Sequence, residues 1–184
     1  MSRHILAVCF DFGDTLVDEG TEVKNDRMQT LRAEFIPGAD QLIRELAAQG
    51  VPLALISDGP VGNVDQVLIA HGLWDLFGAV SISEALGVEK PHCRLFDHAL
   101  ETLQVSQADY SRTVMVGNNL ARDVKGANDL GMISVWLDGS PRYPREPQSL
   151  SEIPQYTIRS PLELLPLLEQ IEQERTNLEL WEVL

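Results

Sequence analysis

The chain has 184 residues and a mass of 20.4 kDa, the size of one domain. Hydrophobic residues make up 44% of it and charged residues 23%, which excludes a collagenous, coiled-coil or largely disordered chain. The net charge of −14 disfavours partners with an anionic surface, so we expect neither a nucleic acid nor a membrane as partner.

Six short apolar segments are predicted to be strands of one parallel sheet. They are apolar at consecutive positions, as expected where helices cover both faces of a sheet. In chain order they are residues 5–10, 51–56, 78–82, 113–116, 133–137 and, more weakly, 156–158. Amphipathic stretches between them predict helices over 39–49, 61–71, 91–103 and 120–130. The alternation predicts an α/β fold, a three-layer Rossmann-like parallel sheet of five to six strands with helices on both faces.

The C-terminal part is predicted to be a loop over 138–155, rich in proline, and a last helix that opens at Ser160-Pro161. Pro166 is expected to kink this helix. We expect one core domain over residues 1–174 and a tail over 175–184. The tail is most simply a mobile segment, and the alternative is a small docking patch made by Leu178, Leu180, Trp181 and Leu184.

The two cysteines, Cys9 and Cys93, have no metal-binding spacing and form no disulfide framework, so we interpret them as core residues. No apolar run is long enough for a signal-peptide core or a membrane span. The expected location is the cytoplasm.

Polar residues follow three of the predicted strands. Asp11, Ser57 and Asn118 each stand just after a strand, and carboxyl ends of parallel strands meet at one ligand-binding edge. Lys90, which opens a helix, and Asp123, one turn beyond Asn118, can reach the same edge. A carboxylate there can act as nucleophile or metal ligand, a lysine can neutralise developing charge, and an oxygen-only ligand set suits Mg²⁺ rather than zinc.

These residues carry a resemblance to a known family. Four segments of the chain resemble the four ordered motifs of the haloacid dehalogenase (HAD) superfamily, and the resemblance runs from about Ile5 to Leu137. They are Asp11-Phe12-Gly13-Asp14-Thr15-Leu16, Leu55-Ile56-Ser57-Asp58-Gly59, Glu89-Lys90-Pro91, and Val116-Gly117-Asn118-Asn119 with Asp123. The resemblance implies a HAD-like fold and a magnesium-dependent hydrolase, most simply a phosphatase with an aspartyl-phosphate intermediate.

The resemblance also implies a role for each matched position. Asp11 would be the nucleophile. Thr15, Ser57, Asp58 and Lys90 would hold the phosphate of a phosphorylated substrate, and Lys90 would also steady the transferred group. The Mg²⁺ cofactor would lie between Asp11, the carbonyl of Gly13, Asn118 and Asp123.

Two departures from the family pattern bear on activity. Phosphatases of the family carry a second aspartate two places after the nucleophile, where this chain has Gly13, with Asp14 one place later. The loss of a general acid typically costs about 10²–10⁴-fold in rate unless Asp14 turns in to replace it. Asn118 stands where an aspartate ligand is usual, which removes one negative charge. The alternative function is therefore a catalytically weak relative that binds a phosphorylated ligand or a protein partner.

The segment 17–35, where many family members insert a cap, is short here, so we expect an open site without a sizeable cap. Such a site suits a large substrate, or a lid from another subunit in an oligomer. Arg142 and Arg145 leave the same edge of the sheet and are either solvated or in contact with an anionic substrate. Asn119 is either a helix N-cap or a site residue.

Overall fold

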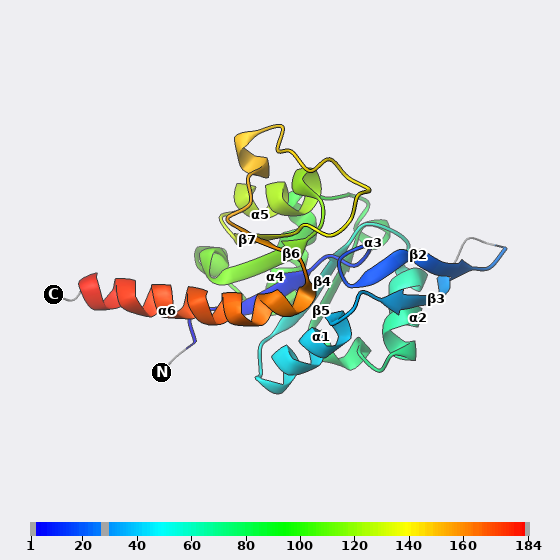
Figure 1. The fold of residues 1–184 in the computed structure, drawn as a ribbon, viewed down its shortest axis with the longest axis horizontal. Coiled ribbons are helices and arrows are strands. Elements are labelled where there is room, and N and C mark those ends of the chain that lie inside the picture. Colours follow the sequence, from blue (N-terminus) through cyan, green and yellow to red (C-terminus); the bar gives the residue numbers. More distant parts are fainter. Residues whose placement is uncertain (1–2, 27–29, 183–184) are drawn as a thin grey trace.

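The computed structural model describes residues 3–26 and 30–182, with side chains up to residue 177. A six-stranded sheet in the order β5-β4-β1-β6-β7-β8 forms its centre, and every neighbouring pair in it is parallel (Figure 1). The strands are β1 Ala7–Phe10, β4 Leu53–Ser57, β5 Ala79–Ile82, β6 Thr113–Gly117, β7 Ile133–Leu137 and β8 Tyr156–Ile158. All six predicted strands, and with them the predicted α/β fold, are confirmed.

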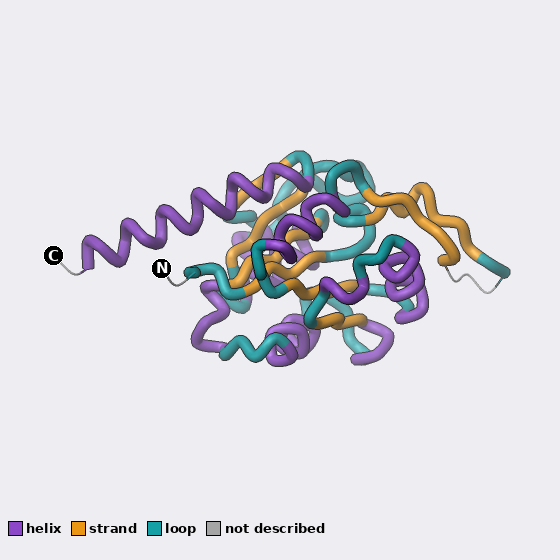
Figure 2. The backbone as a smooth tube through the Cα atoms, turned by 90° about the horizontal axis from the view of Figure 1, so that it is seen from below, coloured by secondary structure: helices purple, strands orange, loops and turns teal. Residues whose placement is uncertain are grey.

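Both faces of the sheet are buried under helices (Figure 2). Successive side chains of a strand point to opposite faces. Val8 and Phe10 of β1 accordingly belong to one core, whereas Ala7 and Cys9 belong to the other. The first core is completed by helices α1 Ala39–Ala48, α2 Val61–Ala70 and α6 Leu164–Glu182; the second by α4 Cys93–Thr102 and α5 Lys125–Asp129.

A two-stranded antiparallel hairpin fills the segment between β1 and α1. It consists of β2 Val17–Lys24 and β3 Thr30–Phe35, and it projects from the sheet beside α2 (Figure 1). The backbone N–H of Thr30 donates a hydrogen bond to Asn63 Oδ1 of α2 across 3.0 Å. The sequence analysis predicted no element here, because β2 reads Val-Asp-Glu-Gly-Thr-Glu-Val-Lys and lacks an apolar run.

The predicted helix 120–130 is two elements. A π-helical turn, η3 Leu120–Val124, precedes α5, and the carbonyl of Asn119 accepts the N–H groups of both Asp123 (2.9 Å) and Val124 (3.3 Å). This wider turn directs Asp123 back toward the sheet, and such turns are frequent at functional sites. The remaining short helices are α3 Ser83–Leu86, η1 Trp74–Leu76, η2 Gln107–Arg112, η4 Leu150–Glu152 and η5 Pro161–Glu163.

The C-terminal region differs from the prediction in two respects. Helix α6 continues as one element to Glu182, through most of the segment assigned to a tail (Figure 1). Pro166 lies in the first turn of α6, where its missing N–H has no partner to lose. The suggested patch at Leu178, Leu180, Trp181 and Leu184 lies outside the described side chains.

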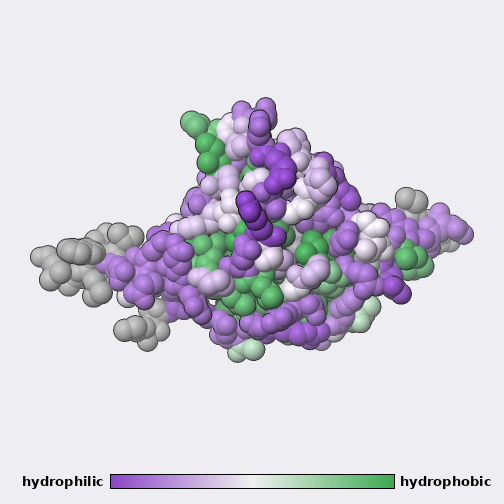
Figure 3. Space-filling model, in the orientation of Figure 1, coloured by the Kyte–Doolittle hydropathy of each residue, from purple (hydrophilic) through white to green (hydrophobic). Residues whose placement is uncertain are grey.

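The predicted loop 138–155 is confirmed apart from η4. Apolar side chains gather on its outer surface, where Leu150 is 87% exposed and Ile153 is 50% exposed (Figure 3). Among the described residues, no helix has both the length and the apolar character that a membrane crossing requires.

Candidate active site

Asp11 occupies the carboxyl end of β1, at the centre of the sheet. Its N–H is held by the carbonyl of Val116 on β6 (2.9 Å), which fixes the strand end. Its carboxylate is buried, and the two oxygens have different partners. Oδ1 accepts a hydrogen bond from Lys90 Nζ at 2.6 Å, and Oδ2 accepts one from the hydroxyl of Thr15 at 2.9 Å. Both partners hold the carboxylate in one orientation at the mouth of the sheet.

Lys90 is a buried cation that joins two carboxylates. Besides Asp11, its Nζ donates to Asp123 Oδ1 at 2.7 Å and to the carbonyl of Ile56 at 3.0 Å. Burial lowers the pKa of this lysine, but Asp11, Asp123 and Asp58 outweigh it and raise the pKa above its ordinary value. Lys90 therefore stays protonated and balances the charge of the site.

Asp123 returns to the sheet from the turn η3. Its Oδ2 accepts the N–H of Asn119 at 2.9 Å, while burial raises its pKa and Lys90 acts in the opposite direction. Gly117 makes this position available, because a Cβ there would lie 2.3 Å from the carboxyl carbon of Asp123. Asn119 caps η3, since its Oδ1 accepts the N–H of Ala121 at 3.0 Å. The capping interpretation of Asn119 is confirmed, and Asn119 also lines the hollow that contains Asp11.

Ser57 and Asp58, both predicted to hold phosphate, have different surroundings in the structure. Ser57 ends β4 and is buried, and its hydroxyl donates a long hydrogen bond of 3.5 Å to the carbonyl of Asp58. Asp58 instead accepts the backbone N–H of Lys90 and a guanidinium N–H of Arg122, each at 3.0 Å. The structure thus brings Asp58 to the Lys90 loop, where it supports the lysine. Arg122, which the sequence analysis missed, also pairs with Glu89 at 3.5 Å.

Asp14 does not face the nucleophile. Its backbone is left-handed, with φ 52°, and its carboxylate accepts hydrogen bonds from the N–H of Glu19 (3.1 Å) and the hydroxyl of Ser140 (3.1 Å). Arg142 Nε pairs with it at 2.9 Å. Asp14 lines a separate cavity near loop 138–155, whereas Gly13 lines the hollow that contains Asp11.

That hollow also contains two residues that the sequence analysis missed, Glu19 of β2 and Tyr143 of the loop 138–155. Burial raises the pKa of Glu19, Arg142 opposes this, and Asp14 and Glu22 add to the increase. Arg142 forms an ion pair with Glu19 as well as with Asp14. The second loop arginine, Arg145, pairs with Asp138 at 2.6 Å within its own loop. The only sequence signal for Glu19 was its place soon after the first motif.

The metal ligands predicted from the sequence line the same hollow, namely Asp11, Gly13, Asn118 and Asp123. Among the side chains that the structure describes, no group of three or more His, Cys, Asp or Glu residues is placed to hold a metal ion. The amide of Asn118 is buried, and its Nδ2 has no hydrogen-bond partner among the described residues. Two carboxylates, an amide and a backbone carbonyl are hard oxygen donors that fit Mg²⁺.

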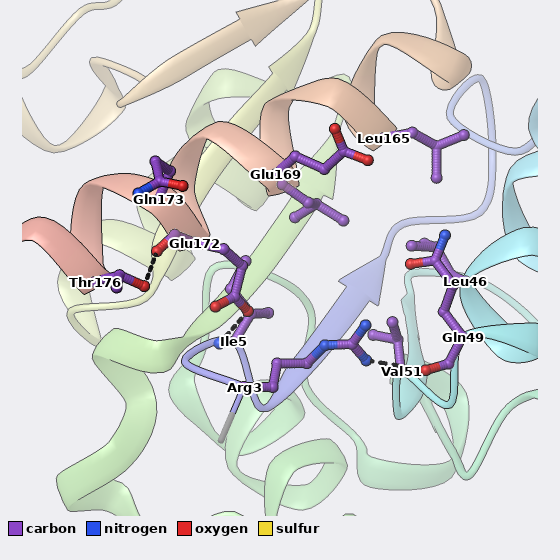
Figure 4. Close-up of a pocket in the computed structure, with 11 residues that line it drawn as sticks. Arg3, Ile5, Leu46, Gln49, Val51, Leu165, Glu169, Glu172, Gln173 and Thr176 are labelled. Atoms are coloured by element: carbon purple, nitrogen blue, oxygen red, sulfur yellow. Dashed lines mark hydrogen bonds between the residues drawn. The ribbon is translucent and has the colours of Figure 1, made fainter. Parts of the chain in front are cut away.

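A second hollow lies away from this edge, between α6 and the segments that enter β1 and β4 (Figure 4). There Glu172 of α6 accepts the N–H of Ile5 at 2.9 Å, and Arg3 donates to the carbonyl of Gln49 at 3.4 Å (Figure 4). The contact of Glu172 anchors α6 to the amino-terminal end of the sheet, and the contact of Arg3 joins the segment before β1 to the end of α1. The chemistry-bearing residues lie at the opposite end, so this hollow is a packing feature.

In a comparison with protein families, residues 19–131 match the model of the haloacid dehalogenase-like hydrolases. The matched range includes Ser57, Lys90 and Asp123 and begins after Asp11.

Among curated proteins, the chain is 33% identical over 140 residues to a glyceraldehyde 3-phosphate phosphatase of Pyrococcus furiosus, covering 76% of this chain and 55% of that protein. It is 34% identical over 134 residues to the pyrimidine 5'-nucleotidase YjjG of Escherichia coli, covering 72% and 56%. A phosphoserine phosphatase of Thermus thermophilus is 33% identical over 122 residues, with 66% and 47% covered. The chain therefore spans about half the length of these relatives.

Solved structures share the fold. A HAD phosphatase from Thermococcus onnurineus superposes with a TM-score of 0.71 at 21% identity, over 89% of this chain and 98% of that chain. At this identity the likeness concerns the fold alone.

Proposed function

Because the chain belongs to the haloacid dehalogenase-like hydrolase family, we propose that it is a magnesium-dependent phosphatase that transfers a phosphoryl group to Asp11. The observation that carries the proposal is the environment of Asp11, a buried carboxylate whose oxygens are bonded by Lys90 at 2.6 Å and Thr15 at 2.9 Å. A nucleophile that is held in place, beside a fixed cation, is what phosphoryl transfer requires.

In the proposed reaction, a carboxylate oxygen of Asp11 attacks the phosphorus of a phosphate monoester, and the bond from phosphorus to the ester oxygen breaks, so that this oxygen leaves with the electron pair and is released as the alcohol once protonated. Lys90 compensates the charge of the transferred group, and the buried hydroxyl of Ser57 is a donor available to its oxygens. Water then cleaves the aspartyl phosphate and restores Asp11.

Mg²⁺, held by Asp11, the Gly13 carbonyl, Asn118 and Asp123, would supply charge stabilisation for the phosphoryl oxygens. The donor set supports this assignment, because every ligand is an oxygen. Because Asn118 stands in place of a carboxylate, the negative charge of the donor set comes from Asp11 and Asp123.

The substrate class that we propose is a phosphate monoester of a small metabolite. Three of the relatives support it, because their names describe phosphatases that act on glyceraldehyde 3-phosphate, pyrimidine 5'-nucleotides and phosphoserine. We further propose that one core domain carries the activity, with the β2–β3 hairpin in place of a larger cap.

The direct test is hydrolysis of p-nitrophenyl phosphate by wild type with Mg²⁺ and with EDTA, alongside Asp11→Asn. The expected result is turnover that needs Mg²⁺ and that Asp11→Asn abolishes. Asp129→Asn, which removes a surface pair with Lys125, is the matched control and should behave as wild type. If wild type binds inorganic phosphate in calorimetry but turns nothing over, the weak-binder alternative replaces this proposal.

A further inference from the structure

Neither residue of the first motif that could be expected to act as the general acid is able to do so. Gly13 has no side chain, and the carboxylate of Asp14 is engaged by Glu19 N–H, Ser140 and Arg142 on the far side of the turn. An alkoxide leaving group nevertheless requires a proton as it departs. A donor must come from another part of the chain.

Glu19 lies in the space that a side chain at position 13 would occupy. A Cβ built on Gly13 would be 1.8 Å from Glu19 Oε1 and 2.7 Å from the carboxyl carbon of Glu19. Two atoms cannot share this space, so the carboxyl group of Glu19 takes the place of a side chain on residue 13. Glu19 also lines the hollow that contains Asp11 and Lys90.

The surroundings hold the Glu19 side chain in this position. Its backbone N–H donates to Asp14 Oδ1 at 3.1 Å, and its Oε2 pairs with Arg142, which leaves Oε1 beside Gly13. Arg142 also pairs with Asp14 at 2.9 Å, so one guanidinium is shared by two carboxylates. The Glu19 side chain is 33% exposed, which gives its carboxyl group access to both the hollow and water.

We infer that Glu19 is the general acid and general base of this site, taking over from a neighbouring strand the role that residue 13 cannot perform. The inference rests on the proposed phosphatase function. It assigns Asp14 and Arg142 as positioning residues, which hold Glu19 without touching the substrate.

The proton transfers balance over the two steps. As Asp11 forms its bond to phosphorus, the bond to the leaving oxygen breaks, and that oxygen keeps the electron pair and takes the proton of the Glu19 carboxylic acid. In the second step, the Glu19 carboxylate takes a proton from water while the water oxygen attacks phosphorus. The bond between phosphorus and Asp11 then breaks, its electron pair returns to Asp11, and Glu19 is again protonated. The net reaction consumes one ester and one water and releases one alcohol and one phosphate.

The test compares two leaving groups in wild type and Glu19→Gln. The substrates are p-nitrophenyl phosphate, whose phenolate departs without much help, and glycerol phosphate, whose alkoxide does not. In kcat/KM, which reports transfer to Asp11, Glu19→Gln should lose about 10²–10⁴-fold on glycerol phosphate and only a few-fold on p-nitrophenyl phosphate. Because the base is lost too, Glu19→Gln should release a burst of nitrophenolate equal to the enzyme concentration and then turn over slowly.

Two variants serve as controls. Glu34→Gln, an exposed glutamate of β3 that pairs with Arg32, should leave both substrates unchanged. Asp14→Asn should lower kcat/KM on glycerol phosphate more than on p-nitrophenyl phosphate, but by less than Glu19→Gln does, because it loosens Glu19 without removing the acid. If Asp14→Asn gives the selective loss and Glu19→Gln does not, Asp14 is the acid and the inference is wrong.

A rescue experiment uses the overlap between the two positions. Glu19→Ala clears the space beside Gly13, and Gly13→Asp in that background restores a carboxylate next to the nucleophile. The double variant should recover at least about tenfold on glycerol phosphate over Glu19→Ala, with melting temperature as the check on folding. If the ratio of kcat/KM between the two substrates is the same in Glu19→Gln as in wild type, the inference is overturned and the proposed function is not. A lack of Asp11-dependent turnover of either substrate by wild type overturns the proposed function and, with it, the inference.

Discussion

Lys90 Nζ lies 2.6 Å from Oδ1 of Asp11, although 79 positions separate the two residues in the sequence. The contact forms because Asp11 ends the central strand β1 and Lys90 lies in the loop that follows β5 and α3. The side chain of the lysine is only 2% exposed, so the ion pair is almost fully screened from water. Removal of a buried cation from between two carboxylates is therefore expected to lower the free energy of unfolding.

Lys90→Met should destabilise the fold by about 3–5 kcal/mol, because it leaves the carboxylates of Asp11 and Asp123 buried without a partner. Urea unfolding measures the loss. Lys125→Met is the matched control, since Lys125 pairs with Asp129 at the surface, where the two side chains are 34% and 45% exposed. That variant should lose less than about 1 kcal/mol. Equal losses in the two variants would show that the buried pair has no special role.

Much of the fold and part of the site could be predicted from the sequence. The six strands are apolar runs covered on both faces, and the topology of a parallel sheet brings Asp11, Lys90 and Asp123 together from three motifs. The hairpin could not be predicted, because β2 is polar and its register with β3 shifts between Asp18 and Val23. The place of Glu19 depends on that register, and so it was missed.

The orientation of the Asp14 side chain could not be predicted from the sequence either. Whether it turns toward Asp11 depends on a backbone with φ 52° and on contacts with Ser140 and Arg142, more than 120 positions away. Such contacts depend on how the loop 138–155 folds over the edge of the sheet. Likewise, the motif match at Asp58 did not reveal that its carboxylate is bonded by the Lys90 backbone and Arg122.

Gly117→Ala should disturb Asp123. The new Cβ would lie 2.3 Å from the carboxyl carbon of Asp123, which is held by both Lys90 and Asn119. We expect a loss of about 1–3 kcal/mol in the free energy of unfolding from the overpacking, together with weaker Mg²⁺ binding. Gly139→Ala is the control, because nothing lies within 4 Å of a Cβ there. If Gly117→Ala unfolds and binds Mg²⁺ as wild type does, the close approach of Asp123 to β6 is not required.

Removal of one ligand at a time tests the metal assignment. Asp123→Ala should weaken Mg²⁺ binding in calorimetry far more than Asp14→Ala, because Asp123 lines the hollow with Asp11 and Asp14 does not. Asn118→Asp should bind Mg²⁺ more tightly than wild type, since it adds a negative charge to the donor set. The reverse order of Asp123→Ala and Asp14→Ala would refute the ligand assignment.

The two cysteines should differ sharply in reactivity. Cys93 is exposed, so its interpretation as a core residue is wrong, whereas Cys9 is buried in the sheet and burial raises the pKa of its thiol to about 12. Native protein should therefore react with one equivalent of a thiol reagent, at Cys93, and Cys93→Ser should abolish the reaction until urea exposes Cys9. Because folding raises the pKa of Cys9, the native state should lose stability as the pH rises from the ordinary thiol range toward 12. Two fast-reacting thiols in the native protein would contradict this burial.

The central claim is that the phosphoryl group passes through Asp11, and one measurement tests it most directly. Wild type and Glu19→Gln are mixed with p-nitrophenyl phosphate and Mg²⁺, quenched in acid within the burst, digested and examined by mass spectrometry. The account predicts a phosphoryl group on the peptide that contains Asp11, more of it in Glu19→Gln than in wild type, and none in Asp11→Asn. Turnover with no phosphorylated Asp11 at any time, or an Asp11→Asn variant as active as wild type, would contradict it.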